Sequence, residues 1–394
     1  MKVLIAGGGT GGHLFPAIAL AEELRSRLPE LSILFVGAEE GVEASLLAAR
    51  GWDFEGIRAS GLLGKPLSQR VRGLALMPSG LIRSRRILRQ FCPDIVVGFG
   101  GYASAAVVLA GVLAGVPTVI HEQNAYPGLA NRWLGKIVDL VAVAFEGASG
   151  YFPKGKVRVT GNPVRKELFG VTRAEAIARF GLDQQRFTLL IFGGSQGAYR
   201  LNQAVLEALP LLEPERERIQ FLHATGRRDL ATVRQGYSAG GYRAVVEPFF
   251  WEIAAAYAAA DLCLCRAGAG TVAELCALGK PSVLVPFPYA ANDHQRRNAE
   301  ALAACGGARM VQDGSMNGIA VAGIVREFHH DREGLRAMAD RAKTQALSDA
   351  AGRVADLVTQ SARPRRSLAK TRKSLQSAVS SQRSAVSNSR CDDV

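Results

Sequence analysis

Two glycine-rich turns constrain the fold more than any other feature of this 394-residue sequence. The first, Gly7–His13, follows the apolar run Val3–Ala6. The second, Gly193–Ala198, follows the apolar run Thr188–Phe192. Each pattern predicts a buried strand, a tight turn and a helix, an arrangement that aims unpaired backbone N–H groups and the positive helix end at an anion. One such unit in each half predicts two facing nucleotide-binding domains with a cleft between them.

Strands and helices alternate along both halves, which is the pattern of parallel sheets wrapped by helices. In the first half we expect strands at Val3–Ala6, Ile33–Val36, Ile95–Val97, Thr118–Ile120 and Leu140–Val143. In the second half we expect strands at Leu189–Phe192, Gln220–Ala224, Ala244–Glu247, Leu262–Leu264 and Ser282–Val285. The predicted fold class is therefore α/β, with two Rossmann-like domains.

The length suits two domains that each bury a core. A glycine and a proline in Val159–Arg165 predict a hinge between the halves. We place the first domain at 1–161, the second at 162–340 and a separate C-terminal helix at 341–361. This last helix, beginning near Leu335 and ending near Ser361, is expected to pack back on the first domain.

The net charge of +13 is unevenly distributed. Residues 362–394 hold eight basic and two acidic side chains, a net charge of +6, and are rich in Ser, Arg and Lys, so we expect a disordered tail. A basic tail without an RNA-binding module argues against a nucleic-acid partner. The six cysteines include no Cys-x2-Cys pair, which argues against a zinc site and favours a reduced, cytosolic location. We see no signal peptide.

The span Ile95–Ile120 contains no charged residue and is long enough to raise the alternative of a membrane helix. Its glycines and Pro117 divide it instead into a strand, a buried helix over Ser104–Ala114 and a second strand. We therefore favour two strands and a helix inside the first domain.

The first turn formally matches G-x-G-x-x-G, for which a dinucleotide-binding oxidoreductase is the default interpretation. No acidic residue ends the second strand about 20 residues from the turn, where a ribose contact belongs; Glu39 and Glu40 come later. A simple dehydrogenase also lacks a second phosphate-binding turn. No G-x-x-x-x-G-K-[ST] is present, so a P-loop NTPase is also disfavoured.

Several polar residues stand where a ligand would meet these turns. His13 either caps the first turn or contacts a diphosphate and serves as a general base. Arg266–Glu274 is a third glycine turn, whose N-terminal amides can hold a leaving diphosphate. Glu274 either accepts two hydroxyl hydrogen bonds from a ribose or only interacts favourably with the positive end of the helix dipole.

Further polar groups follow predicted strands, at the strand ends where open α/β sheets bind ligands. His121–Asn124 is one such group, and Asp293–Gln295 is another. Amide and hydroxyl chemistry of this kind suits a sugar. No Asp-x-Asp pair follows a strand as a metal-diphosphate clamp requires. We therefore expect helix ends with Arg165 or Arg266 to neutralise the phosphates, without a metal.

The segment Leu62–Arg89 mixes apolar residues with seven lysines and arginines. Such a segment suits an anionic bilayer surface. The alternative is an ordinary amphipathic helix with a solvated basic face.

These motifs together resemble the MurG family, the bacterial peptidoglycan N-acetylglucosaminyltransferases that convert lipid I to lipid II. The resemblance covers about residues 1–360. It rests on the first turn through Pro16 and on the segments His121–Asn124, Gly161–Arg165, Gly193–Ala198, Arg266–Glu274 and Asp293–Gln295.

The resemblance implies a GT-B fold, in which two Rossmann-like domains face each other across a cleft. It implies UDP-N-acetylglucosamine (UDP-GlcNAc) as the donor and undecaprenyl-diphosphate-linked N-acetylmuramoyl-pentapeptide (lipid I) as the acceptor, with no cofactor. The expected location is the cytoplasmic face of the bacterial inner membrane. An anionic membrane surface and other cell-wall synthesis and division proteins are candidate partners.

The same resemblance implies which residues bind the substrates. The donor set is Thr10, Gly11, Gly12, Asn124, Arg165, Ser195, Phe250 (through its backbone, toward uracil), the turn with Gly268, Ala269, Gly270, Thr271 and Glu274, and Gln295. Arg266, just before that turn, is the further phosphate-binding candidate named above. His13 and Tyr102 are placed for the acceptor. One position departs from the pattern, because some members carry a second glutamine where this chain has Arg296.

The implied reaction is an attack of the acceptor C4 hydroxyl on C1 of N-acetylglucosamine from the face opposite UDP, which inverts that centre. His13 is our first choice of general base and Glu122 our second. The alternatives with the same architecture are a UDP-GlcNAc epimerase and a glycosyltransferase acting on a different lipid or aglycone.

Overall fold

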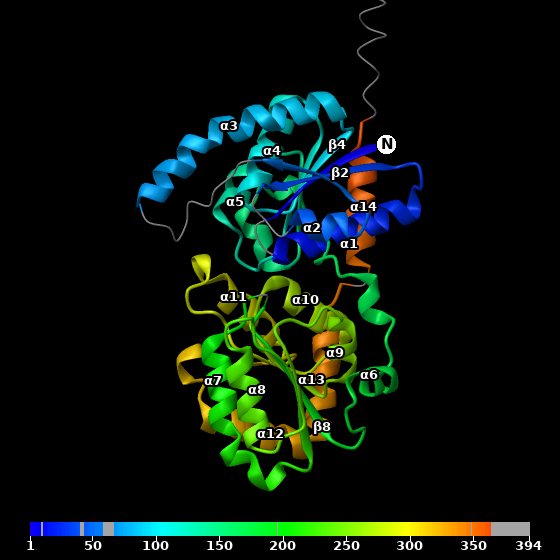
Figure 1. Cartoon of the computed structure of the whole chain (residues 1–394). Coiled ribbons are helices and arrows are strands. Elements are labelled where there is room, and N and C mark those ends of the chain that lie inside the picture. The colour runs from blue at the N-terminus through cyan, green and yellow to red at the C-terminus, as the bar shows by residue number, and fades with distance from the viewer. Residues whose placement is uncertain (9–10, 40–42, 58–66, 195, 348, 364–394) are drawn as a thin grey trace, which may run out of the picture.

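The computed structural model describes residues 1–8, 11–39, 43–57, 67–194, 196–347 and 349–363, which form two stacked lobes (Figure 1). The N-terminal lobe contains a seven-stranded parallel sheet, and the C-terminal lobe contains a six-stranded parallel sheet. The expected tail lies outside the described residues except for its first two positions. The two parallel-sheet lobes have the architecture predicted from the sequence.

The N-terminal sheet has the strand order β3-β2-β1-β4-β5-β6-β7. Its strands are β1 (Lys2–Ala6), β2 (Ser32–Ala38), β3 (Asp53–Ile57), β4 (Ile95–Gly98), β5 (Thr118–Glu122), β6 (Leu140–Val143) and β7 (Val157–Val159). The central strands are short apolar runs because helices cover the sheet on both faces. In the middle of the sheet Ile5 pairs with Phe35 on one side and Val97 on the other.

Helices pack on both faces of this sheet. One face is covered by α1 (Gly11–Arg27), α2 (Glu43–Ala48) and α14 (Ala350–Ser361), and the other by α3 (Leu67–Phe91), α4 (Tyr102–Leu113) and α5 (Leu129–Leu134). Val354 and Val358 of α14 are fully buried in the same cluster as Leu24 of α1. The end of the described chain therefore packs on the N-terminal lobe (Figure 1).

The C-terminal sheet has the order β10-β9-β8-β11-β12-β13. Its strands are β8 (Phe187–Phe192), β9 (Ile219–Ala224), β10 (Ala244–Glu247), β11 (Leu262–Cys265), β12 (Ser282–Leu284) and β13 (Arg309–Met310). The helices α7 (Tyr199–Ala208), α8 (Leu230–Ala239) and α12 (Gly318–His330) pack on one face. The other face carries α6 (Arg173–Phe180), α9 (Ile253–Ala259), α10 (Ala269–Leu278) and α11 (His294–Ala304).

One further helix, α13 (Arg332–Thr344), contributes to both clusters of this lobe. Short 3-10 helices complete the chain: η1 (Glu146–Tyr151), η2 (Lys154–Lys156), η3 (Lys166–Phe169), η4 (Pro210–Glu215), η5 (Ala291–Asp293) and η6 (Asp313–Ser315).

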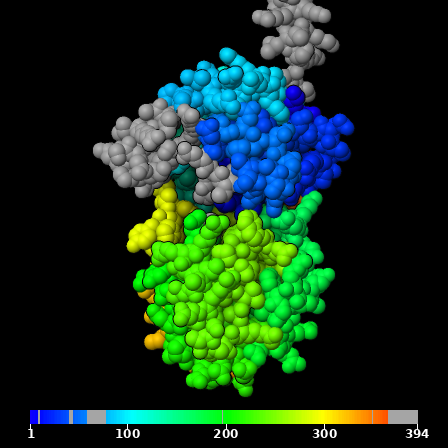
Figure 2. Space-filling view, viewed as in Figure 1, coloured from blue at the N-terminus to red at the C-terminus, as the bar shows by residue number. Residues whose placement is uncertain are grey.

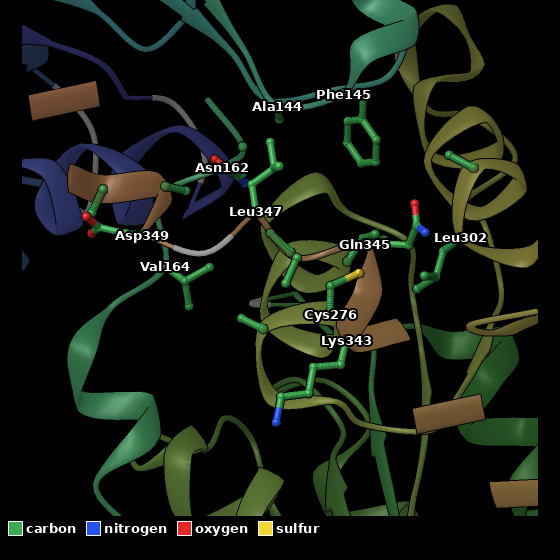
Figure 3. Close-up of a pocket in the computed structure, with 18 of the residues that line it drawn as sticks. Ala144, Phe145, Asn162, Val164, Cys276, Leu302, Lys343, Gln345, Leu347 and Asp349 are labelled. Atoms are coloured by element: carbon green, nitrogen blue, oxygen red, sulfur yellow. The ribbon is translucent and has the colours of Figure 1, made fainter. Parts of the chain in front are cut away.

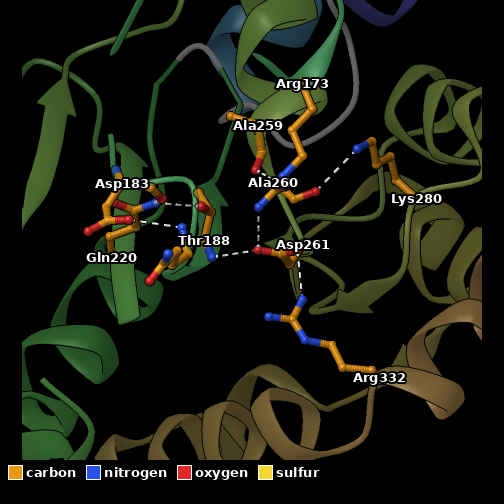
Figure 4. Close-up of polar contacts among 10 residues, drawn as sticks. Arg173, Asp183, Thr188, Gln220, Ala259, Ala260, Asp261, Lys280 and Arg332 are labelled. Atoms are coloured by element: carbon orange, nitrogen blue, oxygen red, sulfur yellow. Dashed lines mark hydrogen bonds and ion pairs between the residues drawn. The ribbon is translucent and has the colours of Figure 1, made fainter. Parts of the chain in front are cut away.

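A polar network connects the amino ends of the C-terminal strands (Figure 4). Asp261, just before β11, accepts hydrogen bonds from the backbone N–H of Thr188 (2.8 Å), from Arg173 (3.0 Å) and from Arg332 (2.9 Å). The Gln220 amide donates to the Thr188 hydroxyl at 2.9 Å. These contacts attach α6 and α13 to the sheet at the end away from the strands' carboxyl ends, where a ligand is expected.

The expected helix over Leu335–Ser361 is wrong in one respect: two helices, α13 and α14, replace it. Asp349 adopts a left-handed backbone conformation (φ 57°) and its side chain caps α14 by accepting from the Gly352 N–H at 3.1 Å. The chain crosses from one lobe to the other between these helices. The boundaries proposed at 340 and 341 thus fall inside α13 rather than between the helices.

The charge-free span folds as β4, α4 and β5, in agreement with the strand–helix–strand prediction. Within the described ranges no helix combines the length and apolarity needed to cross a bilayer.

Candidate active site

The strand order places the ligand-binding edge of each sheet. In both sheets the order reverses beside the first strand, between β1 and β4 in one lobe and between β8 and β11 in the other. Open parallel sheets bind ligands outside the carboxyl ends of the strands at such switch points. The predicted glycine turns follow β1, β8 and β11, and each therefore lies at a switch point.

The first turn leads into α1 and meets the loop that follows β4. Gly11 and Gly12 are exposed at the start of α1. The His13 ring packs so closely on Gly100 that a β-carbon there would lie 3.1 Å from the ring. Gly100 and the next glycine have φ values of +93° and +87°, which only glycine adopts without strain. Tyr102 begins α4 and is 38% exposed. His13 and Tyr102 thus lie on neighbouring loops at the same edge, whereas Thr10 lies outside the described residues.

Glu122 is only 1% exposed and its carboxylate is fully engaged. One oxygen accepts from the backbone N–H of Asn124 (2.9 Å) and from its side-chain amide (3.1 Å). The other accepts from the Gly128 N–H (3.1 Å) and the Asn131 amide (2.9 Å). Four donated hydrogen bonds shape the loop after β5. This geometry disfavours Glu122 as the base, our second choice, and gives it a positioning role.

His121 connects the same loop to the hinge. Its Nε2 donates to the Gly161 carbonyl at 2.9 Å, and its ring stacks on Phe99. Complete burial lowers its pKa to about 4, so the imidazole is neutral at physiological pH. Gln123 donates to the Phe99 carbonyl at 2.8 Å. Of the four polar residues of this segment, three therefore shape the loop, and Asn124 lies toward the other lobe.

Asn298 joins the two lobes and was not singled out from the sequence. It is completely buried on α11, and its Oδ1 accepts from the backbone N–H of Ala125 at 2.9 Å. Its Nδ2 donates to Asn124 Oδ1 and to the Ala267 carbonyl, each at 3.2 Å. One side chain thus connects the loop after β5 to the loop after β11. The space-filling view shows the two lobes in direct contact, the blue and cyan lobe above the green one (Figure 2). The sequence did offer a pointer to Asn298: residues three apart share a helix face, and Gln295, a predicted donor residue, lies three positions earlier on α11.

Arg165 lies between the lobes and is 6% exposed. Its guanidinium pairs with Glu167 (2.8 Å) and Glu274 (3.2 Å), and it stacks over the ring of Phe15 at 4.2 Å from the centroid. The second Glu274 oxygen accepts from the Tyr257 hydroxyl at 3.0 Å. Burial raises the pKa of Glu274, and Arg165 opposes that shift. The ribose contact proposed for Glu274 stays a prediction, now with these two partners beside it.

The turn after β11 opens α10, which has Gly268 as its N-cap and Ala269 as its first residue. A β-carbon on Gly270 would meet nothing within 4 Å, so the face of this turn is open. Arg266 is held beneath it by Asp313 (2.6 Å) and by the carbonyl of Val285 (3.1 Å). Helix N-termini of this kind attract phosphates. Thr271 belongs to the first turn of the same helix.

Other predicted donor residues surround this helix. Gln295 accepts from the Phe287 N–H at 3.0 Å and is half-buried. Phe250 is buried and packs edge-on against Phe180, so only its backbone can face a ligand. Ser195 lies outside the described residues. The structure thus gathers the described donor residues at facing edges of the two lobes, while their individual roles stay predictions. Arg296, the departing position, pairs with Glu300 at 2.7 Å.

Comparison with known proteins supplies the family. The family model "Glycosyltransferase family 28 N-terminal domain" matches residues 3–143, and "Glycosyltransferase family 28 C-terminal domain" matches residues 188–354. A Myxococcus xanthus protein named UDP-N-acetylglucosamine--N-acetylmuramyl-(pentapeptide) pyrophosphoryl-undecaprenol N-acetylglucosamine transferase is 45% identical over 357 residues, covering 91% of this chain and 92% of that protein. The chain belongs to the MurG family.

Further MurG relatives agree. A Geobacter sp. (strain M21) protein with the same name is 45% identical over 92% of this chain and 96% of its own length. The crystal structure of Acinetobacter baumannii MurG matches with a TM-score of 0.71 and 30% identity, covering 91% of this chain and 99% of that one. The UDP-GlcNAc 2-epimerase of Neisseria meningitidis, bound to UDP-GlcNAc, matches with a TM-score of 0.64 but only 15% identity, which shows the shared fold alone. The MurG-family chain thus has a GT-B fold.

Proposed function

We propose that this chain transfers N-acetylglucosamine from UDP-GlcNAc to the C4 hydroxyl of lipid I, with inversion at C1, and so forms lipid II for peptidoglycan. The observation that carries the proposal is 45% identity, over about nine-tenths of the chain, to relatives named for this transfer. An epimerase shares the fold at 15% identity only. The enzyme is therefore a hexosyltransferase that uses UDP-GlcNAc.

The donor would lie between the lobes, with its diphosphate at the N-terminus of α10 and its sugar toward Asn124 and Gln295. As the C1–O bond to UDP breaks, negative charge grows on the diphosphate. Preorganised N–H donors stabilise such charge, and loss of one typically costs about 10²–10³ in rate. Closure of the lobes would exclude water and suppress donor hydrolysis.

His13 is the base that we propose for the acceptor hydroxyl. It is partly exposed at the ligand-binding edge of the N-terminal sheet, whereas both oxygens of Glu122 already accept two hydrogen bonds each. General-base catalysis is typically worth about 10²–10⁴ in rate. We therefore expect His13→Ala to lower kcat by about 10²-fold or more.

The test is a turnover assay with labelled UDP-GlcNAc and a polyprenyl-linked muramoyl acceptor, with a control that lacks acceptor. Glu122→Gln is the comparison variant, because it places an amide against four donors and should disturb the loop, raise KM and lower stability without moving the pH profile. Unchanged kcat in His13→Ala would remove His13 from this role. Sugar release that does not depend on acceptor would argue against transfer.

We propose that the enzyme works at the cytoplasmic face of the inner membrane, as a peripheral protein, because its acceptor is a lipid. In support, Ile82 on α3 is 70% exposed beside the exposed Arg85 and Arg86. Trp133 of α5 is 65% exposed, with the Lys136 ammonium over its ring. Exposed apolar side chains with cationic neighbours suit an anionic bilayer. Contacts with other cell-wall synthesis and division proteins stay a prediction.

Binding to anionic vesicles tests this placement. Replacing Arg83, Arg85 and Arg86 together should release the protein from vesicles that contain phosphatidylglycerol. Arg83 already pairs with Glu55 at 3.1 Å, so we expect the double replacement of Arg85 and Arg86 to account for most of the loss. Undiminished binding of the triple variant would contradict the placement. The side chains of Arg70 and Arg72 lie outside the described part of the chain.

A further inference from the structure

A cavity of about 450 Å³ lies where the chain passes between the lobes (Figure 3). Phe145, from the N-terminal lobe, forms part of its wall, and Cys276 of α10 and Leu302 of α11 line it from the C-terminal lobe. The two chain crossings close it, with Val164 on one and Leu347 on the other. None of the predicted donor residues Asn124, Arg165 and Glu274 lines this cavity, so it is separate from the active site.

The walls of this hinge cavity select an uncharged, apolar occupant. Most lining side chains are alanine, valine, leucine or phenylalanine, and the volume is within the ~300–1,000 Å³ of typical small-molecule sites. Of the three charged residues at its edge, Lys343 is exposed to solvent, and the other two have partners. Lys166 pairs with Glu23 at 2.7 Å, and Asp349 caps α14 and lies 3.7 Å from Arg27. A charged ligand would therefore lose its hydration and gain at most the solvent-exposed ammonium of Lys343 as a counter-charge.

The shape of the hinge cavity depends on the angle between the lobes. Gly161 has a φ of +79°, and a β-carbon there would lie 2.9 Å from Leu347 Cβ and 3.0 Å from Ala350 Cβ. The two crossings therefore touch with no space between them. Phe145 belongs to the N-terminal lobe but packs against the core of the C-terminal lobe. Rotation of one lobe on the other must move these walls.

Helix α10 connects the hinge cavity to the active site. Val272 and Cys276 face the cavity, while the N-terminus of the same helix opens toward the predicted diphosphate site. Asn162, on the first crossing and on the cavity wall, donates to the Ala269 carbonyl in the first turn of α10 at 3.4 Å. An occupant would therefore touch the helix that binds the donor without touching the donor.

We propose that the hinge cavity is a binding site for a compact, uncharged, apolar molecule, which fixes the angle between the lobes and inhibits transfer without competing with UDP-GlcNAc. A ligand that fits one interdomain angle better than others shifts the protein toward that angle by its differential affinity. Turnover then slows because the lobes do not complete their closing and opening.

Indole is the probe, and its binding is measured by titration calorimetry and by soaking crystals of the full chain. We expect saturable binding with density in the hinge cavity, and much weaker binding of the charged indole-3-carboxylate. Ala346→Phe fills the cavity and should raise the Kd of indole by about tenfold or more. Ala301→Leu fills less of the cavity and replaces Ala346→Phe as the test variant if the larger change prevents folding. Ala239→Phe, exposed on α8, is the matched control and should leave the Kd unchanged.

The binding measurements need no turnover, so they are independent of the proposed transfer. In the turnover assay indole should lower the kcat of the parent protein and leave KM for UDP-GlcNAc nearly constant, and Ala346→Phe should abolish its effect. Competition between indole and UDP-GlcNAc would overturn the proposal. Equal binding to Ala346→Phe and the parent protein, or equal binding of the carboxylate, would also overturn it.

Discussion

Asn298 offers the sharpest test of how the two lobes are held together. Asn298→Asp keeps the acceptor that receives the Ala125 N–H but removes the donor to Asn124 Oδ1 and to the Ala267 carbonyl. It also places a carboxylate against two oxygen atoms in a position with 0% exposure. The change removes almost no volume, so its effect reports on hydrogen bonding rather than on packing.

The magnitude follows from the contacts that are lost. Leaving a buried polar group unpaired costs about 1–3 kcal/mol. The loss at Ala267 lies within one lobe and lowers stability, whereas the loss at Asn124 lies between the lobes and disturbs a predicted donor contact. We assign one such loss, about 1–3 kcal/mol, to donor binding and closure, which corresponds to a fall of about fivefold to 150-fold in kcat/KM for UDP-GlcNAc. Protonation restores a donor, so the ratio of variant to parent activity should rise as pH falls toward 5.

The assay is turnover against UDP-GlcNAc concentration, paired with urea unfolding. Gln220→Glu is the matched control, because Gln220 is also 0% exposed and also donates two hydrogen bonds, to the Asp183 carbonyl (2.7 Å) and the Thr188 hydroxyl (2.9 Å). It lies at the far end of the C-terminal sheet (Figure 4). Both variants should lose stability, and only Asn298→Asp should lose kcat/KM. A folded Asn298→Asp within twofold of the parent enzyme would refute the reasoning.

Three further predictions concern stability and the donor site. Asp261→Asn should lower the unfolding free energy by about 1–2 kcal/mol, since it weakens ion pairs with Arg173 and Arg332, whose side chains are 36% and 51% exposed. It should leave KM for UDP-GlcNAc unchanged, and an unchanged urea midpoint would contradict the prediction. Burial lowers the pKa of His121 to about 4 and that of His223 to about 3. The unfolded chain takes up these protons near pH 6.5 and the folded chain does not, so stability should fall from pH 7 to pH 5, by up to about 1.4 kcal/mol per pH unit for each histidine. His223→Gln should flatten that fall, and an identical slope would refute the assignment. Arg165→Lys keeps the charge but loses the planar pairing and the ring stacking, so KM for UDP-GlcNAc should rise about tenfold; titration calorimetry with UDP-GlcNAc gives the independent check, and an unchanged Kd would count against the placement.

The sequence predicts most of the sheets because their central strands are apolar runs that end in glycine turns. It misses β3, β7 and β13 because each lacks such a run: β7 is exposed on two of its three residues, and β13 has only two residues. These strands form only where a neighbouring strand edge is already in place. The break before α14 had a signal, since Asp349 precedes Ala350–Gly352 and aspartate is a preferred N-cap. Helical propensity on both sides of the break obscured it.

The sequence predicts which loops form the candidate site, but not how their side chains point or which residues meet across the lobes. Parallel strands bring their carboxyl ends to one edge, so the turn at His13 and the segment at Glu122 could be placed there from sequence. The direction in which a side chain points could not be predicted from the sequence. Glu122 turns into its own loop because four donors surround it there, and pattern alone does not reveal those donors. The contact between Ala125 and Asn298 joins residues 173 positions apart, and it exists only once the lobes have docked.

Helix α10 forms part of both the predicted diphosphate site and the hinge cavity. Its N-terminus faces the predicted diphosphate site, and Glu274 on its second turn holds Arg165, which stacks on Phe15 of the other lobe. Its opposite flank lines the hinge cavity. A rigid helix cannot move at one end without moving at the other, so a change in the interdomain angle changes the position of the groups that would hold the leaving diphosphate. We expect the same mechanical connection to make turnover sensitive to the hinge, and Asn298 to act beside it, because its side chain donates to the Ala267 carbonyl just before α10.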